Sequence, residues 1–181
     1  NERWARQLVA VFGQAPPQAK VPAGMTGSVL YAEDTSYGVI VIGGPGPNTH
    51  ELDHRFGLVL DVGGDALCRG MIAASTDPEH GNAVVIDLGG NDTYDGGALG
   101  LATGRLGVGL LVDQPGDDVY QMDLGSGGAG FCGLGILFDA RGNDVYMGSR
   151  FTQGAAIGGL GLLFDASGSG RYTSHGYSLG F

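Results

Sequence analysis

The sequence predicts an all-β fold, a parallel β-helix or solenoid whose turns contain about 26 residues each. Three observations predict it. One aspartate recurs at a fixed interval, glycine supplies 37 of the 181 residues, and short apolar segments end at polar, glycine-containing corners. Helical repeats need longer units and do not tolerate this much glycine inside helices. One coil of a parallel β-helix fits the length.

When the sequence is written in rows of 26 residues, the repeat keeps a constant period over five rows and equivalent residues form columns. Its first column consists of aspartates that are equally spaced, without insertion or deletion: Asp61, Asp87, Asp113, Asp139 and Asp165. A second acidic column follows five residues later, with Asp92, Asp118 and Asp144. Tyrosines follow the first column by seven residues, with Tyr94, Tyr120, Tyr146 and Tyr172. Because coils stack with strands about 4.8 Å apart, equivalent residues are expected to lie directly over one another.

The apolar segment before each aspartate predicts a strand. Alternating side chains face opposite sides, and we expect one set to fill the core. This set is Val108, Leu110 and Val112, then Leu134, Ile136 and Phe138. Leu111, Leu137 and Leu163 would then face outward with neighbouring glycines. Part of the outer surface would be apolar and would be covered or serve as a contact surface.

The chain divides into three regions. Residues 1–24 are expected to form a capping helix (1–14) and a Pro-rich linker, residues 25–60 irregular first coils, and residues 61–181 the regular repeats. Gly43 takes the place of the aspartate in the row before Asp61 and stands closer to it than the regular period, which predicts one shorter turn. Residues 28–38 indicate an earlier strand pair. The whole would contain about five to six turns.

The charge balance limits the classes of partner. Nine Lys+Arg stand against nineteen Asp+Glu, giving a net charge of −10, which argues against nucleic acid and anionic membranes. No run of 18 apolar residues is present, so no membrane span is expected. The two cysteines, Cys68 and Cys132, form no disulfide framework. The chain opens at Asn1 without methionine, which favours a processed or excised segment.

Stacked carboxylates need compensation. Two unit charges about 4.8 Å apart repel by about 0.9 kcal/mol even in a water-like dielectric. Hydrogen bonds from the backbone N–H groups that follow each aspartate, as in an Asx-turn, are one source. Calcium between turns is the other, bound by carboxylates of both columns and turn carbonyls, with Asn91 or Asn143 as further ligands. The candidate calcium ligands are Asp87, Asp92, Asp113, Asp118, Asp139 and Asp144. A purely structural turn and a turn with calcium both stay open.

The corners "GGNDTYDGG" and "RGNDVYMGS" resemble the RTX repeat family. In that family calcium ions lie between stacked turns, so the resemblance implies calcium here. It covers about six residues per row and departs in period, with one motif per row in place of tandem nonapeptides. The whole chain also resembles bacterial Gly/Asp-rich solenoid repeat proteins, many of them extracellular or surface-associated.

The tyrosine column has two interpretations. Tyr94, Tyr120, Tyr146 and Tyr172 are expected to stack as a ladder beside the turn. A strip of aromatic rings also binds sugars, so a carbohydrate-binding module is an alternative.

"HELDH" at residues 50–54 is the one motif with catalytic potential. On a helix, His50 and His54 would bind zinc with Glu51 as general base, and Glu79 or His80 would supply a third ligand. The pattern resembles that of zincin metallopeptidases and predicts a zinc-dependent hydrolase. However, the segment has room for two helical turns at best, and His50 falls in the position of Tyr94 when the corners are superposed.

The favoured prediction is therefore a structural or assembly solenoid, not an enzyme, located outside the cell or at its surface. Calcium is the candidate cofactor. Self-association into filaments through the solenoid ends, or through the apolar outer face, is the expected partnership, since Phe181 stops the sequence in mid-turn.

Overall fold

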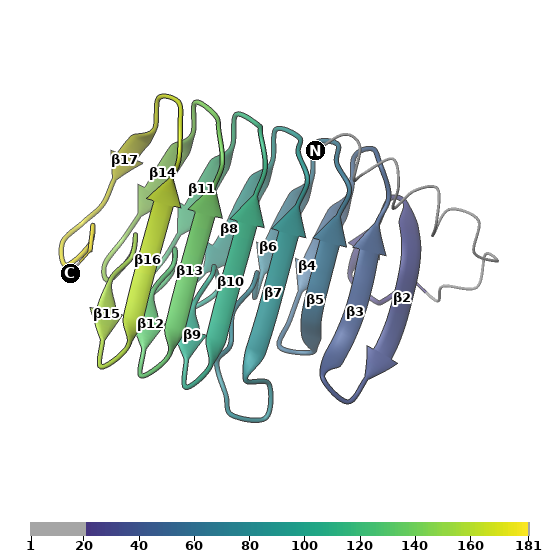
Figure 1. Cartoon of the computed structure of the whole chain (residues 1–181), viewed down its shortest axis with the longest axis horizontal. Coiled ribbons are helices and arrows are strands. Elements are labelled where there is room, and N and C mark those ends of the chain that lie inside the picture. The colour runs from purple at the N-terminus through teal and green to yellow at the C-terminus, as the bar shows by residue number, and fades with distance from the viewer. Residues whose placement is uncertain (1–20, 181) are drawn as a thin grey trace.

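The computed structural model describes residues 21–180 and shows a parallel β-solenoid of about four turns (Figure 1). The described residues are all strand and turn, with no helix. The predicted helix over 1–14, and most of the linker, lie outside the described residues. The all-β, parallel solenoid predicted from the repeat is confirmed.

Three sheets form the sides of the solenoid. The aspartate sheet contains the strands that end in the first acidic column: β5 (Phe56–Asp61), β7 (Asn82–Asp87), β10 (Val108–Asp113), β13 (Leu134–Asp139) and β16 (Leu160–Asp165). They are preceded by β3 (Gly38–Gly43), which ends at a glycine, and at the edge by β2 (Val29–Thr35). The tyrosine sheet contains β4 (Thr49–Leu52), β6 (Leu67–Gly70), β8 (Thr93–Gly97), β11 (Val119–Met122), β14 (Val145–Gly148) and β17 (Arg171–Thr173), with β1 (Met25–Thr26) at its edge. A short third sheet contains β9 (Gly104–Arg105), β12 (Gly130–Phe131) and β15 (Ala156–Ile157).

The strand register confirms the period. Asp113 pairs with Asp139, which pairs with Asp165, and Tyr120 pairs with Tyr146. Hydrogen bonds between neighbouring regular coils span 26 residues. The shorter first turn is confirmed as well, because Ile40 pairs with Leu58, which is less than one full period away.

The first coil differs from the sequence prediction. β2 runs antiparallel to β3, so residues 29–43 form a hairpin and not a further turn of the solenoid. The structure has about four turns where the sequence predicts five to six, and the hairpin adds none to them. The hairpin also ends the aspartate sheet with a strand that exposes Glu33 and Asp34, a common way to prevent another strand from pairing with a sheet edge.

The inward and outward faces are the reverse of those predicted. Leu111 and Leu137 are fully buried, whereas Val108, Leu110 and Val112 are only half-buried on the outside. The prediction is wrong because it does not place the aspartates inside. Asp113 faces the interior, and residues two apart share a face, so Leu111 and Gly109 face inward with it.

The interior is narrow, and inward-facing glycines make room for it. A Cβ on Gly135 would lie 2.1 Å from the Ala129 carbonyl oxygen and 2.8 Å from that of Ala102. Both are backbone atoms of the opposite wall, which cannot rotate away. These inward positions therefore require glycine for close approach of two backbone layers.

We predict that Gly135→Ala destabilises the protein by about 1–3 kcal/mol, the usual cost of overpacking a core. Gly81→Ala is the matched control, because a Cβ at Gly81 meets only the Pro78 carbonyl oxygen at 3.6 Å. Urea unfolding followed by circular dichroism measures both. Equal stability of the two variants would contradict the narrow interior.

Candidate functional site

Aspartates and tyrosines meet inside the solenoid. In each regular coil the chain turns a corner after the aspartate, and the tyrosine seven residues on points back into the same interior from the adjoining sheet. The rings of Tyr94, Tyr120 and Tyr146 are completely buried, and their centroids are 5.0 and 4.8 Å apart with nearly parallel planes. The predicted tyrosine ladder is confirmed.

Hydrogen bonds connect the two columns. The Tyr120 hydroxyl lies 2.8 Å from Oδ2 of Asp113 and 2.8 Å from Oδ2 of Asp139. The Tyr146 hydroxyl donates to Asp139 at 2.9 Å, and Tyr172 donates to Asp165 at 2.7 Å. Tyr120 therefore links the aspartate of its own coil to that of the next.

Proton counting shows that this network needs a protonated carboxyl. Tyr120 and Tyr146 supply two hydroxyl hydrogens for three contacts with Asp113 and Asp139. A third hydrogen bond needs a proton on one of the carboxyls. Burial, followed by the charges of Asp118 and Asp87, raises the pKa of Asp113 well above its usual range, and burial raises the pKa of Asp139 too, so both carboxyls favour holding a proton.

Backbone N–H groups fix one oxygen of every carboxylate in the second acidic column. Oδ1 of Asp92 accepts from the Ala66 N–H at 2.6 Å, and Oδ1 of Asp118 accepts from the Asp92 N–H at 2.6 Å. Oδ1 of Asp144 accepts from the Asp118 N–H at 2.9 Å. Each bond spans one full coil, so these carboxylates are part of the stacking and their second oxygens stay inside.

The two acidic columns form two buried clusters. Asp87, Asp92 and Asp113 make the first cluster, and Asp118, Asp139 and Asp144 make the second. In each cluster every residue offers one carboxylate oxygen, and these oxygens lie within 4.8 Å of one another. All six residues of the predicted calcium set are thus brought together.

Most of these carboxylates keep an oxygen with no hydrogen-bond partner. The buried atoms without one include Oδ2 of Asp87, Asp92, Asp118 and Asp144, Oδ1 of Asp113, and the hydroxyl of Tyr94. Burial is the main cause that raises the pKa of Asp92 and Asp144 to about 6 and of Asp118 to about 8. Burial also raises the pKa of Asp87 well above its usual range. Such oxygens need a proton or a cation, because burying an unpaired carboxylate is costly.

Asp61, the first aspartate of the first acidic column, has different hydrogen-bond partners. Asp61 accepts hydrogen bonds from the Asn48 side chain at 3.0 and 3.2 Å and from the Gly63 N–H at 3.1 Å, and it contacts His50 Nε2 at 2.7 Å. His50 stands in the tyrosine column, as the superposed corners predict, since it pairs with Cys68 and Cys68 with Tyr94. Sequence reasoning does not find Asn48, although its place beside the corner, in a row that lacks the aspartate, is a usable signal.

The other predicted ligands lie elsewhere. Asp65, Asn91, Asp117 and Asn143 form an exposed column outside the corners. Oδ1 of Asn91 accepts from the Asp117 N–H, and the Asn143 amide donates to Asp117. Asn91 and Asn143 are therefore not ligands of the interior clusters. The predicted Asx-turns are present, as in the bond from the Gly89 N–H to Asp87 at 3.0 Å.

The HELDH motif does not form a helical zinc site. His50 lies on strand β4 and faces the interior, whereas His54 lies in an exposed turn with its ring 4.8 Å from that of His80. Glu51 is exposed and pairs with Arg69 at 3.3 Å. Within residues 21–180, His50, His54 and Glu79 do not form a three-ligand cluster. The strand geometry explains the difference, since alternate and not fourth-neighbour residues share a face.

The tyrosine ladder does not form a sugar-binding strip. A sugar ring needs an accessible aromatic face, and Tyr94, Tyr120 and Tyr146 have none. Only Tyr172, in the last coil, is exposed, by 39%.

Comparison of the chain with protein families, with curated proteins and with solved structures found no match. Over residues 21–180 the structure contains no helix with the length and apolar character needed to cross a membrane.

We predict that the metal-free protein loses stability as the pH rises from about 4 to above 8. A carboxyl whose pKa is raised on folding holds its proton more tightly in the folded state, so its contribution is complete below the unfolded value of 3.8. That contribution is lost on the way to the folded values of about 6 for Asp92 and Asp144 and about 8 for Asp118. Each pKa unit is worth about 1.4 kcal/mol, so Asp92 alone contributes on the order of 3 kcal/mol.

Thermal melting in EDTA between pH 4 and 9 measures this. The melting temperature is expected to fall by roughly 6–12 °C from Asp92 alone, given roughly 2–4 °C per kcal/mol for a chain of this size, and to fall further because Asp144 and Asp118 act in the same direction. A melting temperature that rises with pH would contradict the buried, protonated carboxyls.

Proposed function

We propose that this chain is a structural β-solenoid whose interior carboxylate clusters bind calcium. One observation carries the proposal. Five carboxylate oxygens of the two three-aspartate clusters, and one phenol beside them, are completely buried without hydrogen-bond partners.

The donor set supports calcium over softer metals. The cluster ligands are carboxylate oxygens alone, which hard cations prefer, whereas zinc favours nitrogen and sulfur. Oxygens up to 4.8 Å apart fit on opposite sides of an ion that binds oxygen at about 2.3–2.6 Å. Cys68 is buried in the neighbouring coil, and burial together with the charges of Asp87 and Asp61 raises its pKa well above the usual range, which disfavours the thiolate that a soft metal needs.

The role of the cation would be to hold consecutive coils together. The first cluster joins the coil of Asp87 and Asp92 to that of Asp113, so an ion there crosses the interface between two rows. Calcium sites of modest affinity are typical of extracellular modules, and we include a location outside the cell in this proposal.

We predict that calcium raises the melting temperature at pH 7.5 and that EGTA reverses the rise. Binding at 100 times Kd stabilises by about 2.7 kcal/mol, which corresponds to roughly 5–10 °C. Asp92→Asn and Asp118→Asn together should abolish most of this response, because the amide can still accept the backbone bond through its oxygen but no longer carries charge.

Asp95→Asn is the matched control, since Asp95 lies on β8 in the same sheet but is exposed to solvent. It should respond to calcium like the parent. A melting temperature that is the same in calcium and in EGTA would refute the calcium proposal and favour clusters that hold protons.

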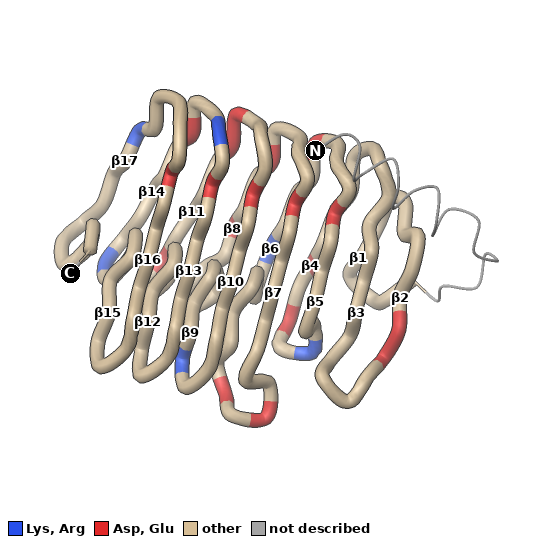
Figure 2. Tube along the Cα trace, in the orientation of Figure 1, with Lys and Arg blue, Asp and Glu red and all other residues tan. Residues whose placement is uncertain are grey.

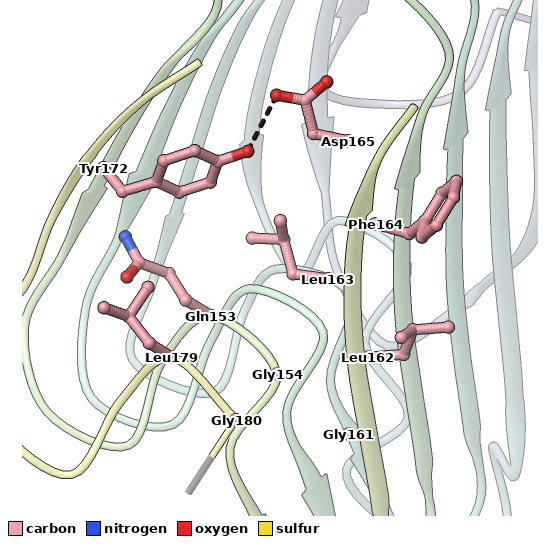
Figure 3. Close-up of a pocket in the computed structure, with 10 residues that line it drawn as sticks. All are labelled: Gln153, Gly154, Gly161, Leu162, Leu163, Phe164, Asp165, Tyr172, Leu179 and Gly180. Atoms are coloured by element: carbon pink, nitrogen blue, oxygen red, sulfur yellow. Dashed lines mark hydrogen bonds between the residues drawn. The ribbon is translucent and has the colours of Figure 1, made fainter. Parts of the chain in front are cut away.

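Assembly through the last coil is a second candidate function. Among the described strands, β16 and β17 each have a hydrogen-bonded neighbour on one side only. Figure 3 shows the hollow beside them, where the Asp165–Tyr172 bond is open to solvent and Leu163 and Leu179 lie nearby. These residues repeat the columns of the inner coils, so a coil of the same register from another copy would continue the stack.

For this candidate we predict an open-ended series of oligomers that shortens in the variant Leu179→Glu. Leu179 is exposed by 63% in the hollow of the last coil, so a charge there should block stacking without disturbing the core. Analytical ultracentrifugation at several concentrations measures it. A closed, single oligomeric state unaffected by Leu179→Glu would exclude stacking through this end.

A further inference from the structure

The outer face of the aspartate sheet is a continuous apolar surface. In five of its strands, every side chain that points outward is uncharged. The aliphatic and aromatic ones are Leu58 and Leu60, Val84 and Ile86, Val108, Leu110 and Val112, Leu134, Ile136 and Phe138, and Leu160, Leu162 and Phe164. We call this set the apolar face. In Figure 2 these strands are free of charged residues except at the inward-facing aspartates at their ends.

The apolar face is regular. Parallel pairing in register stacks like on like, as in Leu110 with Ile136 and Ile136 with Leu162. The rings of Phe138 and Phe164 stack with centroids 5.5 Å apart. Along the face, side chains therefore form straight ridges across the strands, spaced by two residues, with grooves between them.

Over β10, β13 and β16 no described residue covers this face, whereas at the β5 edge Glu79 and His80 line a hollow with Leu58. The outward side chains of β10 and β13 are half-buried between the side chains of adjacent strands. In the last strand, β16, Leu160 is exposed by 61% and Phe164 by 48%. Parallel sheets are as a rule covered on both faces, and here the other two sheets cover only the inner one. Monomeric soluble proteins seldom expose contiguous apolar patches of this size.

We propose that a second copy of this chain covers the apolar face, so that two solenoids pair sheet to sheet about a twofold axis. Charge supports this occupant. The chain carries a net charge of −10, yet the face itself carries none, so two copies meet without placing charges opposite one another. A partner that recognised the chain by charge would bind elsewhere.

Shape and area support the same occupant. Equally spaced ridges and grooves can be complementary to a second copy of themselves, which is what an isologous contact needs. Five strands at about 4.8 Å and six residues at about 3.3 Å give a face of roughly 500 Å². Two such faces bury roughly 1,000 Å² of flat area in total, which is the size at which stable biological interfaces begin.

A membrane surface is the competing occupant and is less well supported. Surfaces that lie on membranes combine apolar side chains with a basic rim. Here the exposed corner beside the face carries Asp65 and Asp117 against one arginine, Arg141, and no lysine lies within residues 21–180. An anionic bilayer would repel this rim.

The test is sedimentation equilibrium of the whole chain, run in both calcium and EGTA so that the result does not depend on the proposed metal. Measured with the variant Leu179→Glu, which removes stacking through the last coil, the chain should be a closed dimer in both buffers, dissociating at micromolar concentration or below. Ile136→Lys with Leu110→Lys should be monomeric, with dimer affinity reduced by at least 100-fold. Should this variant fail to fold, Ile136→Thr with Leu110→Thr retains strand propensity and should weaken the dimer at least tenfold.

Two matched controls place a lysine on other faces. Met147→Lys lies on the outside of the tyrosine sheet and Leu106→Lys at a corner, and both parent side chains are exposed, by 38% and 55%. Both variants should stay dimeric. In this Leu179→Glu background, a monomer at 100 µM, an open-ended oligomer series, equal weakening by the control variants, or flotation with phosphatidylcholine–phosphatidylglycerol vesicles would each overturn face-to-face pairing. A dimer indifferent to calcium would support the pairing even if the calcium proposal failed.

Discussion

The structure depends on the contact between buried aspartates and tyrosines across consecutive coils. Because Tyr120 bonds carboxylates of two coils at once, each 2.8 Å away, the rows can neither slide nor gain a residue without breaking these bonds. The same contact draws Asp113 inside, and Gly109 and Leu111 follow it as alternate residues of the strand. The constant period, the glycine content and the narrow interior are consequences of this one constraint.

Burying a row of carboxylates creates repulsion, and the protein relieves it differently at each position. Asp61 is paired with His50 and Asn48, Asp139 accepts two tyrosine hydroxyls and the Arg141 N–H, and the exposed outer column alternates aspartate with asparagine. Asp87 accepts a hydrogen bond from the Gly89 N–H but none from the tyrosine column, where its neighbours are Cys68, a weak donor, and Tyr94, whose hydroxyl makes no hydrogen bond. The first cluster therefore has the greatest need for a proton or a cation.

The sequence predicts the period, the register and the short first turn because a spacing without insertions leaves few other ways to stack the rows. It also predicts which carboxylates meet. It does not predict which face they occupy, because the usual preference of charge for water puts Asp113 outside and Leu110 inside, and the tyrosine bonds reverse both. The hairpin of β2 escapes prediction for another reason. The pattern of residues 28–38 predicts strands but does not distinguish parallel from antiparallel pairing. The turn at Ser36 and Tyr37 makes the pair antiparallel.

The interior clusters and the apolar outer face have a common origin. Successive side chains of a strand point to opposite faces, so an aspartate that faces inward determines the face of each remaining residue. The strand that brings Asp139 and Leu137 into the core must therefore turn Leu134, Ile136 and Phe138 to the outside. Polar residues at these outward positions would satisfy water equally well in an isolated solenoid. Their absence from strand after strand supports the proposal that the face is covered, and the inner chemistry of the coil determines which of its sides is apolar.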